Sequence, residues 1–202
     1  MDEQISRRNF LRGVGASAMA GAMAKVAAAA QSVGSLDDQK PFGLEPIKLV
    51  LQVNGKKYEV EAESRVTLLD LLRNRLQFTG AKEVCDRATC GACTVLVDGQ
   101  PVYSCMKLVV EMQAQEITTI EGLGGPDNLT PTQRAFVDCD ALMCGYCTPG
   151  FVMSLTALYS ANQNPTLDEI KKACSGNLCR CGTYPHIFKA AQRVAGSGPS
   201  TA

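Results

Sequence analysis

Four cysteines near the middle of the chain have the spacing of ligands to a small metal cluster. The segment from Cys85 to Cys93 reads C-x4-C-x2-C, and Cys105 follows after eleven further residues. A plant-type [2Fe–2S] centre uses such a pattern, because one loop wraps three thiolates around the irons and a distant segment supplies the fourth. Zinc is the alternative, although zinc sites usually combine C-x2-C with a second short pair. The pattern favours an iron–sulfur cluster bound by Cys85, Cys90, Cys93 and Cys105.

Small residues beside these cysteines favour the same chemistry. Gly91 and Ala92 lie between Cys90 and Cys93. Without bulky side chains the backbone can approach a cluster closely, so that its N–H groups point at the sulfurs and lower the cost of the negative charge. We therefore expect Gly91 and Ala92 to form part of the cofactor-binding loop.

A second group of four cysteines lies nearer the C-terminus, as Cys144-Gly-Tyr-Cys147 and Cys179-Arg180-Cys181. Each pair directly precedes a predicted helix. Ligands at two helix N-termini can converge on one anionic centre, which the positive ends of the helix dipoles favour, and Arg180 adds charge of the same sign. Zinc remains an alternative. Because this group follows a ferredoxin-type loop, we expect a second iron–sulfur cluster, held by Cys144, Cys147, Cys179 and Cys181 with Arg180 beside it.

Two cysteines and the single histidine fall outside both groups. We expect Cys139 and Cys174 to be small buried apolar residues on helix faces. His186 could be considered a Rieske-type ligand, but a Rieske centre needs two histidines and the chain has one. His186 is therefore interpreted as a surface or interface residue.

The N-terminus is typical of an export signal. Arg7 and Arg8 are followed by Phe10, Leu11 and an uncharged segment rich in alanine and glycine, residues 13–24. This arrangement predicts a twin-arginine signal peptide over residues 1–30, and hence a periplasmic protein. A basic amphipathic helix is the alternative. The uncharged segment is well short of the roughly 20 residues needed to span a membrane.

Export would normally favour disulfides in a chain with ten cysteines. Two arguments make disulfides the second interpretation. The twin-arginine route carries folded proteins, so a metal cofactor can be inserted before export. The cysteines within Cys90/Cys93, Cys144/Cys147 and Cys179/Cys181 are also too near each other in sequence for good disulfide geometry.

The elements that must position the first group of cysteines predict a mixed sheet with one helix. After a polar linker (31–46), alternating apolar residues predict a strand over 47–53, and Asn54-Gly55 predicts a hairpin turn to a strand over 57–60. Thr67 caps a leucine-rich helix over 68–73. Further strands are expected over 94–97, 101–104 (which delivers Cys105) and 117–120, with a turn at Asp98-Gly99 between the first two. Together they predict a β-grasp ferredoxin-like domain over residues 47–121.

The second group of cysteines is expected in an all-helical region. No strand pattern follows the glycine-rich boundary at residues 122–126. Threonine N-caps at Thr130, Thr148 and Thr166 predict helices to about residues 142, 162 and 174, and Tyr184-Pro185 opens a fourth to about residue 195. The predicted fold class is thus α+β: a β-grasp domain followed by a small four-helix bundle over 127–196, with a tail over 197–202.

Taken together, these motifs resemble the small iron–sulfur subunit of molybdenum hydroxylases of the xanthine oxidase family. The matching segments are C-D-x3-C-G-A-C-T-V-L from Cys85, D-G-x-P-V-x-S-C ending at Cys105, C-G-Y-C-T-P-G from Cys144 and G-N-L-C-R-C ending at Cys181. They cover about residues 47–195. The signal peptide and Gly182-Thr183-Tyr184 are similar to the exported aldehyde-oxidising and isoquinoline-type branch.

The resemblance implies an electron-transfer chain with two [2Fe–2S] clusters in series. Electrons would come from a molybdenum-pterin cofactor on a separate large subunit and leave to an FAD subunit or a c-type cytochrome. No catalytic residue is expected, because the chain has no general-base candidate, no G-x-G-x-x-G and no phosphate loop. Zero net charge and few aromatic residues give no indication of nucleic-acid binding. A free exported ferredoxin-like carrier and a disulfide- or zinc-held binding module remain as alternatives.

Two positions depart from the family pattern. The family usually has glycine where this chain has Ala88, so a positive φ there would strain the loop. The family often has a glutamine that hydrogen-bonds the pterin where this chain has Met143. A thioether cannot replace an amide as both donor and acceptor, so we expect a different pterin contact at Met143.

Overall fold

The computed structural model describes residues 45–196, all of which belong to one compact unit. The predicted signal peptide (1–30), the predicted linker except its last two residues (31–46) and the predicted tail (197–202) lie outside the described residues. Within residues 45–196, no helix has both the length and the apolar character that crossing a membrane requires.

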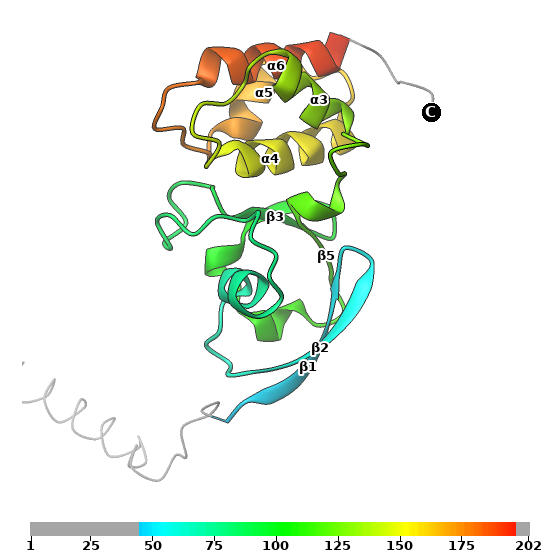
Figure 1. Cartoon of the computed structure of the whole chain (residues 1–202), viewed down its shortest axis with the longest axis vertical. Helices are drawn as coiled ribbons and strands as arrows, with labels where there is room; N and C mark the ends of the chain where they lie inside the picture. Colours follow the sequence, from blue (N-terminus) through cyan, green and yellow to red (C-terminus); the bar gives the residue numbers. More distant parts are fainter. Residues whose placement is uncertain (1–44, 197–202) are drawn as a thin grey trace, which may run out of the picture. The chain divides into compact units, whose positions relative to one another are not determined.

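A five-stranded mixed sheet occupies the first half of the described chain, with strand order β2-β1-β5-β3-β4 (Figure 1). Its strands are β1 (Ile47–Val53), β2 (Lys56–Ala62), β3 (Thr94–Val97), β4 (Gln100–Tyr103) and β5 (Glu116–Thr118). β5 pairs parallel to β1 and antiparallel to β3, and the other pairs are antiparallel. The hairpins turn where sequence predicted, at Asn54-Gly55 and Asp98-Gly99, whose four positive φ angles suit two-residue turns.

One short helical segment packs against this sheet. It begins as α2 (Leu68–Asp70) and continues as the π-helical η2 (Leu71–Arg75). Thr67 caps it as predicted, because its hydroxyl accepts a hydrogen bond of 3.2 Å from the Asp70 N–H. The core beneath contains strand residues and four buried leucines of this segment: Leu68, Leu69, Leu71 and Leu72.

Four helices form the second half: α3 (Pro131–Asp138), α4 (Thr148–Ala161), α5 (Leu167–Cys174) and α6 (Tyr184–Gly196). Their core includes Phe136, Phe151, Leu155, Ile170 and Ile187. With the mixed sheet they give the predicted α+β class.

Two helix ends differ from the sequence prediction. α3 ends at Asp138 and not near residue 142, because the chain turns left-handed at Asp140, which has a φ of 51°. The N-cap of α4 is Cys147, so Thr148 is its first helical residue and not its cap. This shift of one residue places a predicted metal ligand at the helix N-terminus.

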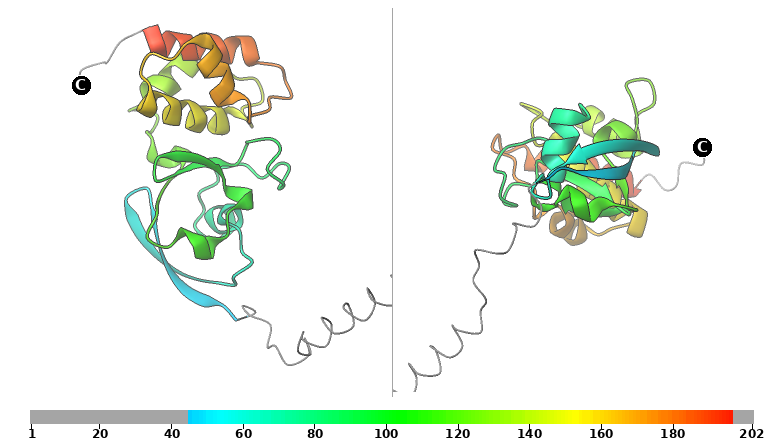
Figure 2. Two further views of the ribbon diagram at one scale, coloured as in Figure 1. Left: turned by 180° about the vertical axis from the view of Figure 1, so that it is seen from behind. Right: turned by 90° about the horizontal axis from the view of Figure 1, so that it is seen from below.

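The helix α4 packs against β3, as both Figures 1 and 2 show. All four residues of β3 are buried, although a strand with one solvent-facing side would alternate. The close approach depends on Gly150 in the first turn of α4, because a Cβ at this position would clash with the carbonyl oxygen of Gly91.

Candidate metal centres

The first three cysteines lie in the loop between η2 and β3. The part of this loop that carries the cysteines, residues 85–93, contains three residues with positive φ: Asp86 (51°), Ala88 (55°) and Gly91 (68°). Residue 88 therefore has the positive φ at which the sequence predicted strain, and this chain has an alanine there. These left-handed residues bend the loop, and the N–H of Thr89 points back to the Cys85 sulfur at 3.4 Å.

The fourth cysteine of this group, Cys105, lies just beyond the strand expected to carry it. β4 ends at Tyr103, and Cys105 is the middle residue of the 3-10 turn η3 (Ser104–Met106). The Ser104 hydroxyl donates to the Cys93 carbonyl at 2.7 Å, which ties this turn to the cysteine loop. Cys93 and Cys105 are both buried.

The thiols of this group interact in two pairs, Cys85 with Cys90 and Cys93 with Cys105. In residues 45–196, no three His, Cys, Asp or Glu side chains are grouped closely enough for a single metal ion. Four cysteine thiolates that interact in two pairs suit a [2Fe–2S] cluster, in which each of two irons takes two of the four cysteines. The donor set of the loop therefore fits such a cluster.

The electrostatic environment differs between these pairs. Burial raises the pKa of Cys85, but hydrogen bonds from the Arg87 and Thr89 backbone N–H groups outweigh it and lower the pKa to about 7. Burial is the main cause that raises the pKa of Cys93 to about 12, and the neighbouring Cys105 thiol contributes to this rise. A bound cation would overcome the raised pKa of Cys93, because metal coordination deprotonates a thiol outright.

The second group surrounds the N-terminus of α4. The Cys147 thiol makes no capping hydrogen bond and interacts with the thiol of Cys179. Burial is the main cause that raises the pKa of Cys147 to about 12, and the thiols of Cys179 and Cys144 contribute to this rise. Cys144 and Cys181 are exposed, whereas Cys179 is buried. The chain thus brings Cys147 and Cys179 together from the turns before α4 and α6.

Backbone groups also stabilise the Cys179 sulfur. The Thr183 N–H donates to it at 3.4 Å. Burial raises the pKa of Cys179, but this hydrogen bond and others from its neighbours lower it overall. The Tyr184 hydroxyl accepts a hydrogen bond of 2.9 Å from the Cys179 N–H. The role of Tyr184 was not predicted from sequence, where it served only as a helix start.

Exposed apolar side chains gather near the second group. Leu142, Met143, Tyr146 and Leu178 have exposed fractions of 42%, 69%, 50% and 51%. A hollow of about 390 Å³ nearby is lined by residues that include Met143, Cys181 and His186. The predicted neighbour Arg180 is also exposed. Exposed apolar side chains thus flank the exposed Cys144, and the exposed Cys181 lines the hollow together with Met143.

The cysteines outside both groups are buried, as expected. Cys174 is the last residue of α5, and burial raises its pKa to about 12. Cys139 caps the C-terminus of α3, and its carbonyl oxygen accepts a hydrogen bond of 3.0 Å from Nδ1 of the exposed His186. The histidine thus joins α3 to α6 and lies on the surface, as predicted.

Comparisons with known proteins agree with this arrangement. Residues 52–137 match a family described as "2Fe-2S iron-sulfur cluster binding domain", and residues 119–192 match one described as "[2Fe-2S] binding domain". The chain is 40% identical to the aldehyde oxidoreductase iron-sulfur-binding subunit PaoA of Escherichia coli O157:H7, over 96% of this chain and 90% of that one. It is 43% identical to the nicotine 6-hydroxylase small subunit of Paenarthrobacter nicotinovorans, over 74% of this chain and 90% of that one.

A solved structure shows the same fold. The crystal structure of quinoline 2-oxidoreductase from Pseudomonas putida 86 matches with a TM-score of 0.72 and 37% sequence identity, over 75% of this chain and 94% of that chain. The chain therefore belongs to the family of small iron–sulfur subunits of xanthine oxidase-type molybdenum hydroxylases.

Proposed function

We propose that this chain is the electron-transfer subunit of a multi-subunit molybdenum hydroxylase that oxidises an aldehyde or an N-heterocycle. The observation that carries the proposal is two groups of four cysteines, each with neighbouring thiols, within one compact unit of this family. When bound, each [2Fe–2S] cluster takes up and releases one electron at a time. No residue of this chain is proposed to contact the substrate.

The eight ligands are divided between the proposed domains. In the domain over residues 47–121, Cys85, Cys90, Cys93 and Cys105 hold one cluster, and Gly91 and Ala92 let the backbone approach it. In the domain over residues 127–196, Cys144, Cys147, Cys179 and Cys181 hold the other, and Arg180 offsets part of its negative charge. The N–H groups of Thr89 and Thr183, which already point at ligand sulfurs, stabilise the same charge.

The apolar surface formed by Leu142, Met143, Tyr146 and Leu178 is the proposed contact with the large molybdenum subunit. It lies next to the exposed ligands Cys144 and Cys181, so a pterin bound by that subunit would lie close to the second cluster. Met143 would contact the pterin through apolar surface only, since a thioether is a weak acceptor and no donor. Electrons would leave from the first cluster to an FAD subunit or a c-type cytochrome.

The proposed location is the periplasm, reached by the twin-arginine route. The support is the sequence Arg7-Arg8 with the uncharged segment that follows. Replacing both arginines by lysine should keep the chain in the cytoplasmic fraction of the producing cell. Equal amounts of both proteins in the periplasmic fraction would refute this part of the proposal.

Purification of the native complex tests the function. The tagged chain should bring with it a larger molybdenum-containing protein. It should itself contain about four irons and four acid-labile sulfides, since each of two clusters holds two of each. Mixing the complex with a substrate of the large subunit should bleach the visible iron–sulfur absorption. Zinc in place of iron, or no molybdenum protein in the complex, would overturn the proposal.

A further inference from the structure

The two cysteine groups are joined by direct hydrogen bonds between the segments that carry them. The N–H of Leu178, next to the ligand Cys179, donates to the carbonyl oxygen of Cys90 at 2.9 Å. The Tyr103 hydroxyl donates to the Gly176 carbonyl at 3.2 Å. The backbone of one ligand and the neighbour of another are thus in contact.

The side chain of Asn177 lies at the centre of this contact and is 4% exposed. Its Nδ2 group donates to the Gly91 carbonyl at 2.9 Å and is 3.4 Å from the Thr94 hydroxyl. Its Oδ1 atom accepts a hydrogen bond of 2.8 Å from the Ser154 hydroxyl. Every hydrogen bond of this amide therefore reaches a different element: the cysteine loop, β3 or α4.

Three ligands are anchored through these partners. Gly91 directly follows Cys90, Asn177 lies two residues before Cys179, and Ser154 belongs to α4, which has Cys147 at its N-cap. The backbones of the cysteine loop and of the segment before Cys179 approach each other closely at this point. A Cβ at Gly91 would clash with the Gly176 carbonyl oxygen and would lie 2.6 Å from Nδ2 of Asn177.

We propose that Asn177 is a positioning residue for electron transfer between the two clusters. Its amide holds the loop of Cys90 against the segment that leads to Cys179 and so sets the separation of the two centres. The inference rests on the proposed function. With both clusters bound, one electron at a time would pass from the cluster held by the helical half to the cluster held by the Cys90 loop, without a proton. The electrons come from substrate oxidation on the large subunit.

The change Asn177→Asp isolates the donor group of this amide. Aspartate has the same shape but places a carboxylate oxygen opposite the Gly91 carbonyl, where two acceptors repel and a buried charge is unpaired. The loop is expected to move away from residue 177. The rate of electron tunnelling falls steeply as the distance between two centres grows, so we expect a severalfold loss of rate.

The experiment uses the intact complex with Asn177→Asp, Ser154→Ala and the control Asn164→Asp. Asn164 is exposed, and its side chain is on the same half, so the control makes the same chemical change away from both cysteine groups. Iron and sulfide are assayed first. The magnetic interaction between the clusters is then measured by electron paramagnetic resonance after dithionite reduction. The reduction of the cluster held by the Cys90 loop is timed after mixing with substrate.

We expect Asn177→Asp to keep its iron, to lose part of the magnetic interaction and to transfer electrons severalfold more slowly between clusters. Ser154→Ala should show a smaller change in the same direction, and Asn164→Asp none. Wild-type interaction and rate in an iron-replete Asn177→Asp complex would overturn the inference. If Asn177→Asp fails to retain iron, Ser154→Ala decides, and an unchanged signal and rate in it would overturn the inference.

A failure of this inference is distinguishable from a failure of the proposed function. If the function is wrong, the wild-type complex lacks iron or is not reduced by substrate. If only the inference is wrong, the wild-type complex behaves as proposed and the Asn177 variant behaves like it.

Discussion

At the scale of single residues, Ala88 shows a conformation that its side chain disfavours. Its φ of 55° in the first cysteine loop costs an L-residue about 1–2 kcal/mol relative to glycine. Glycine would regain this energy but lose about 0.4–1 kcal/mol through the greater freedom of the unfolded chain. We therefore predict that Ala88→Gly raises the free energy of unfolding by about 0.5–1 kcal/mol, measured by denaturant titration of the iron-loaded chain.

The matched control is the same change where the backbone is helical. Ala157 lies inside α4, where glycine costs about 1 kcal/mol relative to alanine. Ala157→Gly should therefore lower the free energy of unfolding, in the opposite direction to Ala88→Gly. If both substitutions destabilised the chain equally, strain at residue 88 would be refuted.

Cys174 is buried like the proposed ligands Cys93 and Cys105, but it lies outside both cysteine groups. Its thiol is 3% exposed, and burial raises its pKa to about 12. We predict that Cys174→Ala retains the full iron content, whereas Cys181→Ala loses about half of it, since one of two clusters lacks a ligand. Iron and sulfide assays on the purified variants check this. Equal iron loss in both variants would contradict the assignment of Cys174.

The buried Cys174 thiol should also make the stability of the folded chain depend on pH. The unfolded chain releases the Cys174 proton near its ordinary pKa of 9.0, whereas the folded chain keeps it up to about 12. The stability that the neutral thiol provides is fully present below pH 9.0 and is lost as pH rises toward about 12. The wild-type chain should therefore lose more stability than Cys174→Ala across this range in denaturant titrations. Parallel losses would contradict the raised pKa.

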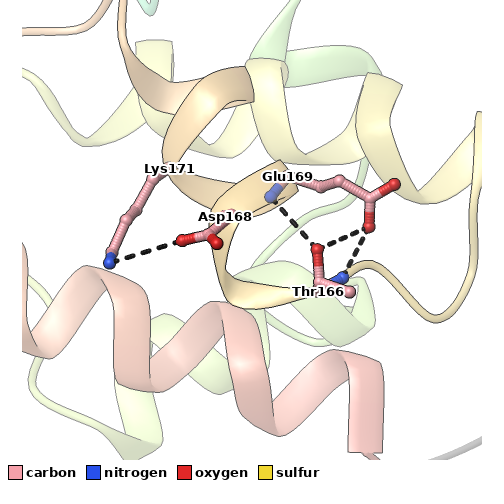
Figure 3. Close-up of polar contacts among 4 residues, drawn as sticks. All are labelled: Thr166, Asp168, Glu169 and Lys171. Atoms are coloured by element: carbon pink, nitrogen blue, oxygen red, sulfur yellow. Dashed lines mark hydrogen bonds and ion pairs between the residues drawn. The ribbon is translucent and has the colours of Figure 1, made fainter.

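At the scale of elements, α3 and α5 both begin with a capping box, but the residue that pairs with the N-cap threonine is a glutamine in α3 and a glutamate in α5. At α5, the Thr166 N–H donates to Oε2 of Glu169 at 2.7 Å, and the Glu169 N–H donates to the Thr166 hydroxyl at 3.3 Å (Figure 3). At α3, Gln133 takes the place of the glutamate opposite Thr130. The nearby pair of Lys171 and Asp168 at 3.7 Å is exposed and adds little.

The two boxes should respond differently to pH. Hydrogen bonds from the Thr166 backbone and hydroxyl lower the pKa of Glu169 below its ordinary 4.5. Their stabilising effect is present above pH 4.5 and is lost as pH falls through the lowered pKa. We predict that the loss of melting temperature caused by Glu169→Ala shrinks in acid, whereas that caused by Gln133→Ala does not. The outcome that would contradict this is a pH-independent effect of Glu169→Ala.

At the scale of the whole molecule, the sheet and the helices are held together by the contact of α4 with the first cysteine loop. A methyl group at Gly150 would meet the Gly91 carbonyl, which is backbone and cannot rotate away. Overpacking of this kind costs about 1–3 kcal/mol, while alanine in a helix gains up to about 1 kcal/mol over glycine. We predict that Gly150→Ala lowers the free energy of unfolding by about 1–2 kcal/mol and reduces iron retention during gel filtration.

Gly196 supplies the control for this prediction. It also lies in a helix, α6, but nothing is within 4 Å of the Cβ that alanine would add. Gly196→Ala should leave stability unchanged or slightly raised. If Gly150→Ala behaved in the same way, the close contact of the two halves would not be needed for stability or iron binding.

Features that depend on neighbours in the chain could be predicted from sequence. The hairpin turns at Asn54-Gly55 and Asp98-Gly99, the caps at Thr67, Thr130 and Thr166, and the helices that follow the cysteine pairs all occur as expected. Each is governed by backbone preferences and hydrogen bonds over a few residues, which local residue types specify. The cysteine spacings belong to the same class, because a loop of given length limits which thiols can meet.

Features that depend on packing emerged only in three dimensions. The contact of Asn177 with Gly91 joins residues that are 86 positions apart. It has no local signature, since an asparagine between Gly176 and Leu178 would suit any turn. Hydrogen bonds of this kind form only where two separately folded segments meet, so the chain's residues specify them jointly and no short stretch reveals them.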